Sequence, residues 1–196
     1  MGVSQVRELM ERIRREGVHV GEGIVKLDSF LNHQVDAGLT ERMGAEFFTR
    51  FTDRHKTVPS KIVTAEVSGI PPALATARMF DVPLVYARKH RSSVMTDVYY
   101  LAQTVSRTHG DEVNLMISKR YLNADDQVLI IDDFLATGST ITTLASLIVA
   151  SCARLLGIGC VIEKPREGGR LQLTELNVPI ETLARIDFHG EDLVVS

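Results

Sequence analysis

The chain has few of the residues that build disulfide-bonded or zinc-bound folds. Its 196 residues include two cysteines and no tryptophan, and only 6% are aromatic. The cysteines form neither a C-x-x-C pair nor a ligand quartet, which excludes a structural zinc site of the usual spacing. Secreted scaffolds carry more cysteines. We therefore expect Cys152 and Cys160 to be reduced thiols in the core of a cytoplasmic protein.

The sequence also lacks an excess of positive charge and a long apolar segment. It has 22 Lys and Arg against 25 Asp and Glu, which argues against a protein that coats nucleic acid. The charged N-terminus contains no apolar run typical of a secretory signal. The longest uncharged stretch, 134–153, contains Gly138 and many Ser and Thr residues, so it predicts a loop and a core helix. We expect no nucleic-acid partner and no membrane contact.

What remains has the composition of a globular protein. Hydrophobic residues make up 44% of the chain, and the length suits one domain over residues 1–196. Apolar residues at helical spacing predict a first helix that ends at Gly17 and a second from Thr40 to about Asp53. The stretch 27–34 has no clear period and is expected to be a loop.

Short apolar runs alternate with helical segments in the rest of the chain. The runs are 61–65, 82–87, 128–131 and 156–162. Between them one helix is expected at 73–79 and another, after a loop, that ends at about 153. This order is typical of an α/β fold with a mostly parallel sheet flanked by helices. Two further strands, 97–101 and 112–118, interrupt it. We expect them to form a hairpin that acts as a flexible flap over about 90–120.

One segment combines a buried strand with groups that bind ligands. Val128-Leu129-Ile130-Ile131 is followed by the adjacent acids Asp132 and Asp133, and then by a loop of small and hydroxylated residues, Ala136-Thr137-Gly138-Ser139-Thr140. Ligands of parallel sheets bind at the carboxyl ends of strands, where the two acids fall. The loop can direct backbone N–H groups and the positive end of the next helix dipole at one phosphate.

Two carboxylates beside a phosphate site require a ligand that also offers hydroxyl groups or a cation. A ribose 5-phosphate satisfies both demands, with its 2′- and 3′-hydroxyls at the acids and its phosphate in the loop. The alternative is a strand-to-helix turn in which Ser139 or Thr140 caps the helix. The apolar strand and the acid pair favour the phosphate site.

The strand, the acid pair and the A-T-G-S-T loop resemble the phosphoribosyl diphosphate (PRPP) signature of type I phosphoribosyltransferases. A Walker A loop is excluded because no Gly-Lys-Ser/Thr follows the required spacer. Further stretches across nearly the whole chain are similar to the bacterial xanthine phosphoribosyltransferase family, namely 26–34, 68–73, 87–90, 158–164 and 181–186. The resemblance implies the type I phosphoribosyltransferase fold, with residues 1–36 as a hood over the base.

The resemblance also implies a reaction and the residues that serve it. In this purine-salvage reaction, xanthine and PRPP would give xanthosine 5′-monophosphate (XMP) and pyrophosphate with Mg²⁺, in a homodimer whose partner subunit borders the active site. The implied PRPP site comprises Ala136, Thr137, Gly138, Ser139 and Thr140 at the 5′-phosphate and Ser68, Gly69 and Lys89 at the pyrophosphate. The implied purine site comprises Val25, Asn32 and Lys164.

We expect Asp132 and Asp133 to be the catalytic residues. Displacement at the anomeric carbon has oxocarbenium character, and two nearby carboxylates stabilise that positive charge. No covalent nucleophile is required, and no residue is assigned as a direct metal ligand. Four histidines without metal-ligand spacing are expected to be structural or exposed: His33, His55, His90 and His109.

Several alternatives stay open. The xanthine family usually has A-N-G-Q-A in the loop, whereas A-T-G is more like adenine enzymes, and Ala136 stands where hypoxanthine-guanine enzymes carry an Asp. Adenine, hypoxanthine and guanine therefore remain alternative bases. By position alone, Lys164 is equally a strand-end lysine that extends to solvent, and Asn32 a turn residue. An alternative of another class is a PRPP-sensing regulator without catalysis.

Overall fold

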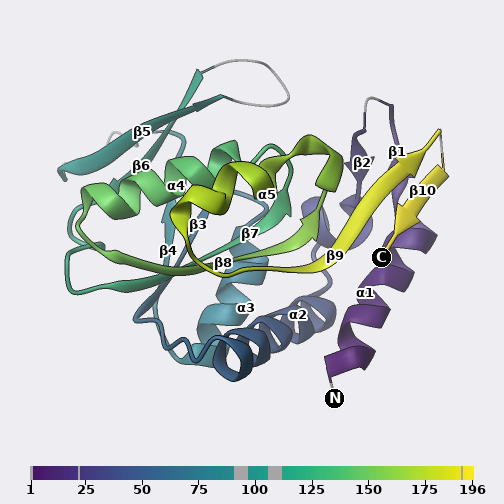
Figure 1. Ribbon diagram of the computed structural model, residues 1–196, viewed down its shortest axis with the longest axis horizontal. Helices are drawn as coiled ribbons and strands as arrows, with labels where there is room; N and C mark the ends of the chain where they lie inside the picture. The colour runs from purple at the N-terminus through teal and green to yellow at the C-terminus, as the bar shows by residue number, and fades with distance from the viewer. Residues whose placement is uncertain (1, 22, 91–96, 106–111, 191) are drawn as a thin grey trace.

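The structure is built on a six-stranded sheet in the order β10-β9-β8-β7-β3-β4 (Figure 1). The computed structural model describes residues 2–21, 23–90, 97–105, 112–190 and 192–196. The strands are β3 (Lys61–Ala65), β4 (Leu84–Ala87), β7 (Gln127–Leu135), β8 (Arg154–Glu163), β9 (Ile180–His189) and β10 (Asp192–Val195). All neighbours are parallel except β9 and β10. The predicted α/β class with a mostly parallel sheet is confirmed.

Helices cover both faces of this sheet (Figure 1). They are α2 (Ala37–Thr49) and α3 (Ile70–Phe80) on one face, and α4 (Ser139–Ala150) and α5 (Gly169–Gln172) on the other. Side chains of β7 alternate between the two apolar cores. Leu129 and Ile131 pack on the side of α2 and α3, and Val128 and Ile130 on the side of α4. A continuous apolar strand is buried in this way on both faces.

The N-terminal segment lies at one end of the sheet, near β9 and β10 (Figure 1). It consists of α1 (Gly2–Glu16) and an antiparallel hairpin of β1 (Val18–His19) and β2 (Val25–Lys26). Arg14 of α1 donates a 2.6 Å hydrogen bond from Nη2 to the Val195 carbonyl in β10. Lys164, just after β8, donates a 2.9 Å hydrogen bond to the Gly23 carbonyl. The hairpin therefore borders the carboxyl end of β8.

The excursion after β4 is a two-stranded antiparallel hairpin outside the central sheet (Figure 1). Its strands are β5 (Tyr99–Val105) and β6 (Glu112–Ser118). The predicted hairpin is confirmed, although its first strand begins after the predicted Asp97 and extends further. Residues 91–96 and 106–111, which include His109, lie outside the described residues.

Two helices begin earlier than predicted. α2 begins before Thr40, because Asp36 is its N-cap and accepts a 3.0 Å hydrogen bond from the Leu39 N–H. α3 begins at Ile70, before the predicted Ala73, since proline is tolerated in a first turn whose N–H groups have no helical partner. No helix in the described part of the chain is long and apolar enough to span a membrane.

Two local predictions are wrong. The stretch expected to be a loop contains a turn of π-helix, Asp28–Asn32, which buries Phe30 and Leu31. Cys152 is exposed in the turn after α4, whereas Cys160 is buried as predicted, and both thiols are free.

Candidate active site

The paired acids lie inside β7 rather than after it. The apolar run predicts an end at Ile131, but pairing with β8 continues through Asp132 to Leu135. Backbone hydrogen bonds to β8 therefore extend β7 beyond its apolar run. Both acids lie toward the carboxyl end of a parallel strand, the edge at which such sheets bind ligands.

The carboxylate of Asp132 is buried, and nearby donors and cations compensate little of its charge. It is 5% exposed, and its Oδ1 accepts a 3.1 Å hydrogen bond from the Asp133 N–H. Burial raises the pKa of Asp132 well above its usual range, the charge of Asp133 raises it further, and the charge of Lys89 opposes both. Burial also raises the pKa of the Cys160 thiol on the neighbouring strand, so Cys160 is no thiolate nucleophile.

Asp133 is half-buried and connects the acid pair to the N-terminal segment. Its Oδ2 accepts a 3.0 Å hydrogen bond from Asn32 Nδ2, and its Oδ1 accepts one of 3.0 Å from the Phe134 N–H. Asn32 is the last residue of the π-helical turn, so that turn directs the amide at the acids. The fold thus brings together two predicted site residues that are far apart in the sequence.

The loop after β7 leads directly into α4, with Gly138 as the N-cap. Gly138 has a φ of 85°, in the left-handed region that favours glycine. The N-cap residue makes no side-chain hydrogen bond, and Ser139 and Thr140 are already helical, so the alternative in which Ser139 or Thr140 caps α4 is wrong. The helix N-terminus presents N–H groups beside the hydroxyls of Thr137 and Ser139, which lie 3.3 Å apart.

A residue that sequence reasoning missed supports this loop. Gly169, the first residue of α5, donates a 3.0 Å backbone hydrogen bond to the Ala136 carbonyl. A Cβ on Gly169 would overlap that carbonyl and lie 2.7 Å from the Gly138 nitrogen. The loop therefore rests on the backbone of α5, with no space for a side chain between them. The local sequence carries no signal of this contact, because only the fold brings the two segments together.

The turn before α3 contacts Asp132. Gly69 is the N-cap of α3, and a Cβ there would overlap both Thr64 Oγ1 and Asp132 Oδ1. Thr64 of β3 is fully buried, and its hydroxyl has no partner among the described residues. Ser68 precedes Gly69 and is partly exposed. The predicted pyrophosphate turn thus lies against the acid pair. Thr64 was missed because its position beside Asp132 depends on the pairing of β3 with β7.

Replacing Gly69 by alanine is expected to lower the free energy of unfolding by about 1–3 kcal/mol, the usual cost of overpacking. The added methyl group has no space between Thr64 and Asp132. Urea denaturation measures the change. Gly38→Ala is the matched control, since its methyl group would meet the flexible end of Arg42 in an exposed helical turn. Equal stability of Gly69→Ala and the unmodified chain would contradict this packing.

Lys164 has a buried ammonium group, so the interpretation of a lysine extended to solvent is wrong. The residue is 8% exposed, Nζ donates to the Gly23 carbonyl, and it lies 5.2 Å from the centre of the Phe134 ring. A cation held beside an aromatic face is a suitable donor to a carbonyl of a flat ligand. Phe134 was missed because, in sequence, it is indistinguishable from a strand residue of the core.

The hairpin of the N-terminal segment borders a cavity of about 390 Å³ next to Lys164. His19 and Phe188 line it and stack with ring centres 4.2 Å apart. Val25, on the same hairpin, is 6% exposed and packs in the apolar core. Its contact with a ligand stays a prediction.

Lys89 completes the cluster at this edge. It follows β4, its backbone N–H donates a 2.6 Å hydrogen bond to Glu66 Oε1, and its exposed side chain carries the charge that acts on Asp132. Across the described ranges, no group of three or more His, Cys, Asp or Glu is arranged to hold a metal ion. The arrangement suits a ligand with hydroxyl groups and separate anionic ends.

Comparisons with known proteins agree with this geometry. A family model for the phosphoribosyl transferase domain matches residues 34–187, which include the acid pair, the loop 136–140 and the turn at Ser68 and Gly69. The chain belongs to this family. The predicted relation to type I phosphoribosyltransferases is thereby confirmed.

Curated relatives match over nearly their whole length. The chain is 50% identical over 181 residues to the xanthine phosphoribosyltransferase of Deinococcus deserti, which covers 92% of each chain. It is 46% identical over 179 residues to the xanthine phosphoribosyltransferase of Lacticaseibacillus casei, covering 91% of this chain and 92% of the relative. The resemblance to the bacterial xanthine phosphoribosyltransferase family is confirmed.

Solved phosphoribosyltransferase structures share the fold. The adenine phosphoribosyltransferase of Thermoanaerobacter pseudethanolicus has a TM-score of 0.72 at 20% identity and covers 90% of this chain and 99% of its own. That of Saccharomyces cerevisiae has a TM-score of 0.72 at 24% identity and covers 92% and 99%. At such identities the likeness concerns the fold alone, and the predicted type I phosphoribosyltransferase fold is confirmed.

Proposed function

We propose that this chain is a xanthine phosphoribosyltransferase, an enzyme of purine salvage that converts xanthine and PRPP to XMP and pyrophosphate. The observation that carries the proposal is the convergence of three groups at one sheet edge: the acid pair, the loop 136–140 and the buried Lys164. Names of the curated relatives, at 46–50% identity, support xanthine as the base.

The loop and the acid pair hold the ribose phosphate of PRPP in this proposal. The 5′-phosphate accepts hydrogen bonds from N–H groups at the start of α4 and from the hydroxyls of Thr137, Ser139 and Thr140. The 2′- and 3′-hydroxyls donate to Asp132 and Asp133. A carboxylate pair that would repel a phosphate is therefore matched with hydroxyl donors.

The reaction breaks the bond between C1 of the ribose and the diphosphate oxygen and forms a bond from C1 to a purine nitrogen. The electron pair of the broken bond leaves with the pyrophosphate, and the purine nitrogen gives up its proton, which the pyrophosphate oxygens can accept. C1 carries positive charge in the transition state, which the carboxylates of Asp132 and Asp133 stabilise. Lys89 and the turn of Ser68 and Gly69 hold the departing pyrophosphate, because a cation and a close backbone approach suit an anion.

Mg²⁺ is proposed to bind together with PRPP. Two adjacent carboxylates, with no third acidic or histidine ligand grouped near them among the described residues, fit a cation whose other ligands are substrate oxygens and water. When bound, the ion neutralises charge on the diphosphate. Asp132 and Asp133 are the groups that would face it.

The purine is proposed to lie between β7, β8 and the N-terminal hairpin. The ammonium of Lys164 donates to a ring carbonyl, the amide of Asn32 reaches the purine edge, and Phe134 offers an apolar face. Residues 1–36 act as the hood, which the Asn32–Asp133 hydrogen bond supports. The hairpin of β5 and β6 acts as the flap over PRPP.

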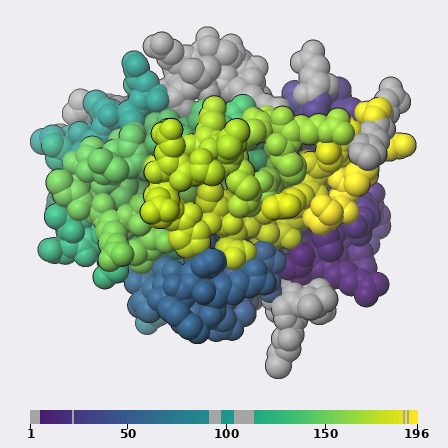
Figure 2. All heavy atoms as spheres, viewed as in Figure 1, coloured from purple at the N-terminus to yellow at the C-terminus, as the bar shows by residue number. Residues whose placement is uncertain are grey.

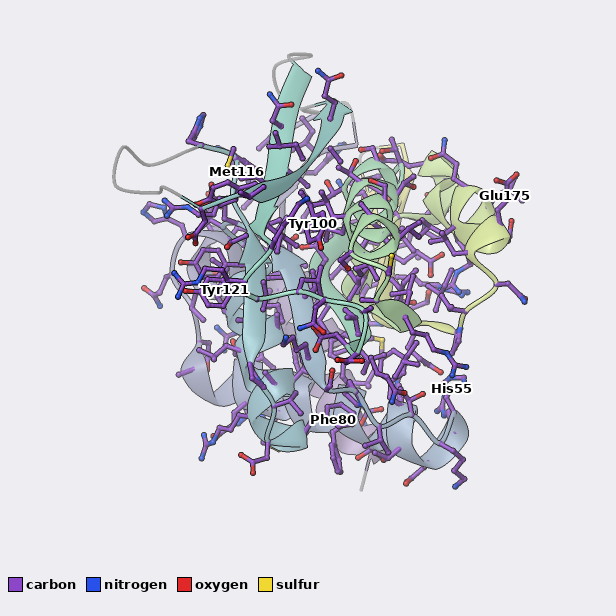
Figure 3. All side chains as sticks on the ribbon, turned by 90° about the vertical axis from the view of Figure 1, so that its left-hand side faces the viewer. His55, Phe80, Tyr100, Met116, Tyr121 and Glu175 are labelled. Carbon is purple, nitrogen blue, oxygen red and sulfur yellow. The ribbon has the colours of Figure 1, made fainter. Side chains whose placement is uncertain are left out.

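A homodimer is proposed on the edge of the sheet beside the hairpin. A cavity of about 620 Å³ lies there, lined partly by Tyr86, Met116 and Tyr121, the last two of which Figure 3 marks. Tyr86 and Tyr121 are 43% and 55% exposed. Exposed aromatic side chains at an edge strand favour association with another subunit. The cytoplasmic location stays a prediction.

Initial rates with PRPP, Mg²⁺ and each of xanthine, hypoxanthine, guanine, adenine and uracil test the function. We expect kcat/KM to be highest for xanthine, since a site that reads polar groups discriminates against bases that lack them. A preference for adenine would overturn the proposed base while keeping the reaction. Absence of turnover with all five bases, together with PRPP binding, would favour the regulator alternative.

A further inference from the structure

Glu163 is a buried acid that the proposed chemistry does not use. It is the last residue of β8, directly before Lys164, and is 3% exposed. Its carboxylate accepts two hydrogen bonds from Arg170, from Nε to Oε1 at 2.7 Å and from Nη2 to Oε2 at 2.8 Å. This parallel pair fixes the orientation of both side chains, which a single contact does not.

Arg170 belongs to the helix that supports the phosphate loop. It follows Gly169, whose N–H donates to the Ala136 carbonyl and whose Cα lies too close to the loop for a side chain. Glu163, the other partner of the ion pair, lies in β8, a central strand that pairs with β7. The ion pair therefore joins the sheet to the one short helix turn on which the loop rests.

We infer that the Glu163–Arg170 ion pair is a positioning device that holds α5 against the loop 136–140 and so sets the affinity for the 5′-phosphate of PRPP. This inference rests on the proposed function, since it requires the loop to bind that phosphate. In the proposed complex neither residue contacts the substrate. Both act through the backbone of Gly169.

Further bonds distinguish this pair from an ordinary surface ion pair. Thr182 donates a 2.9 Å hydrogen bond to Glu163 Oε2, and Arg170 Nη1 donates one of 3.1 Å to the Ile180 carbonyl of β9. Burial alone would raise the pKa of Glu163, but the hydrogen bonds from Arg170 and Thr182 lower it below its usual range. Figure 2 shows the yellow-green atoms of α5 adjoining the yellow atoms of β9. The helix is thus tied to two strands at once.

The contacts that hold Lys164, at the proposed purine site, differ from those that hold the loop 136–140, at the proposed phosphate site. Lys164 has two anchors outside α5, a 2.8 Å hydrogen bond from its N–H to the Leu135 carbonyl and the bond from Nζ to Gly23, besides a 3.8 Å contact with Glu167 in the turn before α5. Loss of the ion pair frees α5 and widens the loop, whereas Lys164 keeps its anchors. KM for PRPP should therefore rise while KM for xanthine changes little.

Arg170→Met tests the inference in the full-length enzyme. We expect KM for PRPP and the Kd of ribose 5-phosphate, measured by calorimetry, to rise at least tenfold, while KM for xanthine changes less than threefold. Arg170→Lys keeps the charge with one hydrogen bond. Its KM for PRPP and its Kd for ribose 5-phosphate should lie between those of Arg170→Met and those of the unmodified enzyme. Arg185→Met is the matched control, because Arg185 contacts the same carboxylate at 3.1 Å but is 53% exposed, and its KM values should stay within twofold.

The outcomes separate the inference from the proposed function. An unmodified enzyme that binds no ribose 5-phosphate would overturn the assignment of the loop, and the inference with it. Normal PRPP affinity in Arg170→Met, or an equal rise in both KM values, would overturn the inference alone. If Arg170→Met does not fold, Arg170→Lys decides, and an unchanged KM for PRPP in that variant would likewise overturn it.

Discussion

Asp133→Asn is expected to lower kcat by a factor on the order of 10²–10³ while leaving the fold intact, the usual loss when a preorganised electrostatic group is removed. The carboxylate lies at the carboxyl end of β7 and faces the ribose in the proposed complex. Asparagine has the same shape, so its oxygen still accepts the hydrogen bond from the Phe134 N–H. What disappears is the negative charge that stabilises positive charge at C1, together with the hydrogen bond that Oδ2 accepts from Asn32 Nδ2.

Steady-state kinetics at saturating PRPP and xanthine measure this effect, with far-ultraviolet circular dichroism as the check on the fold. Asp125→Asn is the matched control, because Asp125 is an exposed acid in the turn before β7, at the opposite end of the strand. Its kcat should stay within twofold of the unmodified enzyme. Equal kcat values for Asp133→Asn and the Asp125→Asn control would show that the carboxylate does not act on the transition state.

The part of the site that the residues alone indicated is encoded within one short segment, whereas the predicted residues outside it came from the family resemblance. The apolar strand, the acid pair and the loop follow one another along the chain, and parallel-sheet geometry is enough to place them at one edge. The parts that sequence reasoning missed depend on contacts between segments. Thr64 beside Asp132 requires β3 beside β7, and Arg170 on Glu163 requires α5 to fold back over β8.

Errors at element boundaries have local causes. Asp36 is a typical N-cap residue, so the start of α2 was readable from sequence, but the apolar period draws attention to the later Thr40. β7 extends past its apolar run because neighbouring strands supply backbone partners to Asp132 and Asp133 regardless of side-chain polarity. Such pairing between strands leaves no signal in the local sequence pattern.

Asp132→Asn is expected to abolish most turnover and at the same time stabilise the fold. The residue is buried, and its raised pKa means that the folded state holds a proton more tightly than the unfolded state. Stability contributed by this group is therefore lost as pH rises from the unfolded value, about 3.9, through the raised folded pKa. At neutral pH the unfolded chain carries this carboxylate charged while burial in the folded state opposes the charge, so the group costs stability, and a neutral asparagine that keeps the hydrogen bond from the Asp133 N–H removes that cost.

Thermal denaturation of Asp132→Asn and the unmodified enzyme between pH 4 and pH 8 tests the sign. We expect the melting temperature of the variant to exceed that of the unmodified enzyme by at least about 2 °C at pH 8, since 1 kcal/mol shifts a chain of this size by about 2–4 °C. The gap should shrink as pH falls toward the unfolded value of about 3.9, because the unfolded chain then also takes up the proton. A variant less stable at pH 8 would mean that the charge is compensated in the folded state, whereas a more stable but inactive variant would show that the enzyme keeps this buried acid for its chemistry.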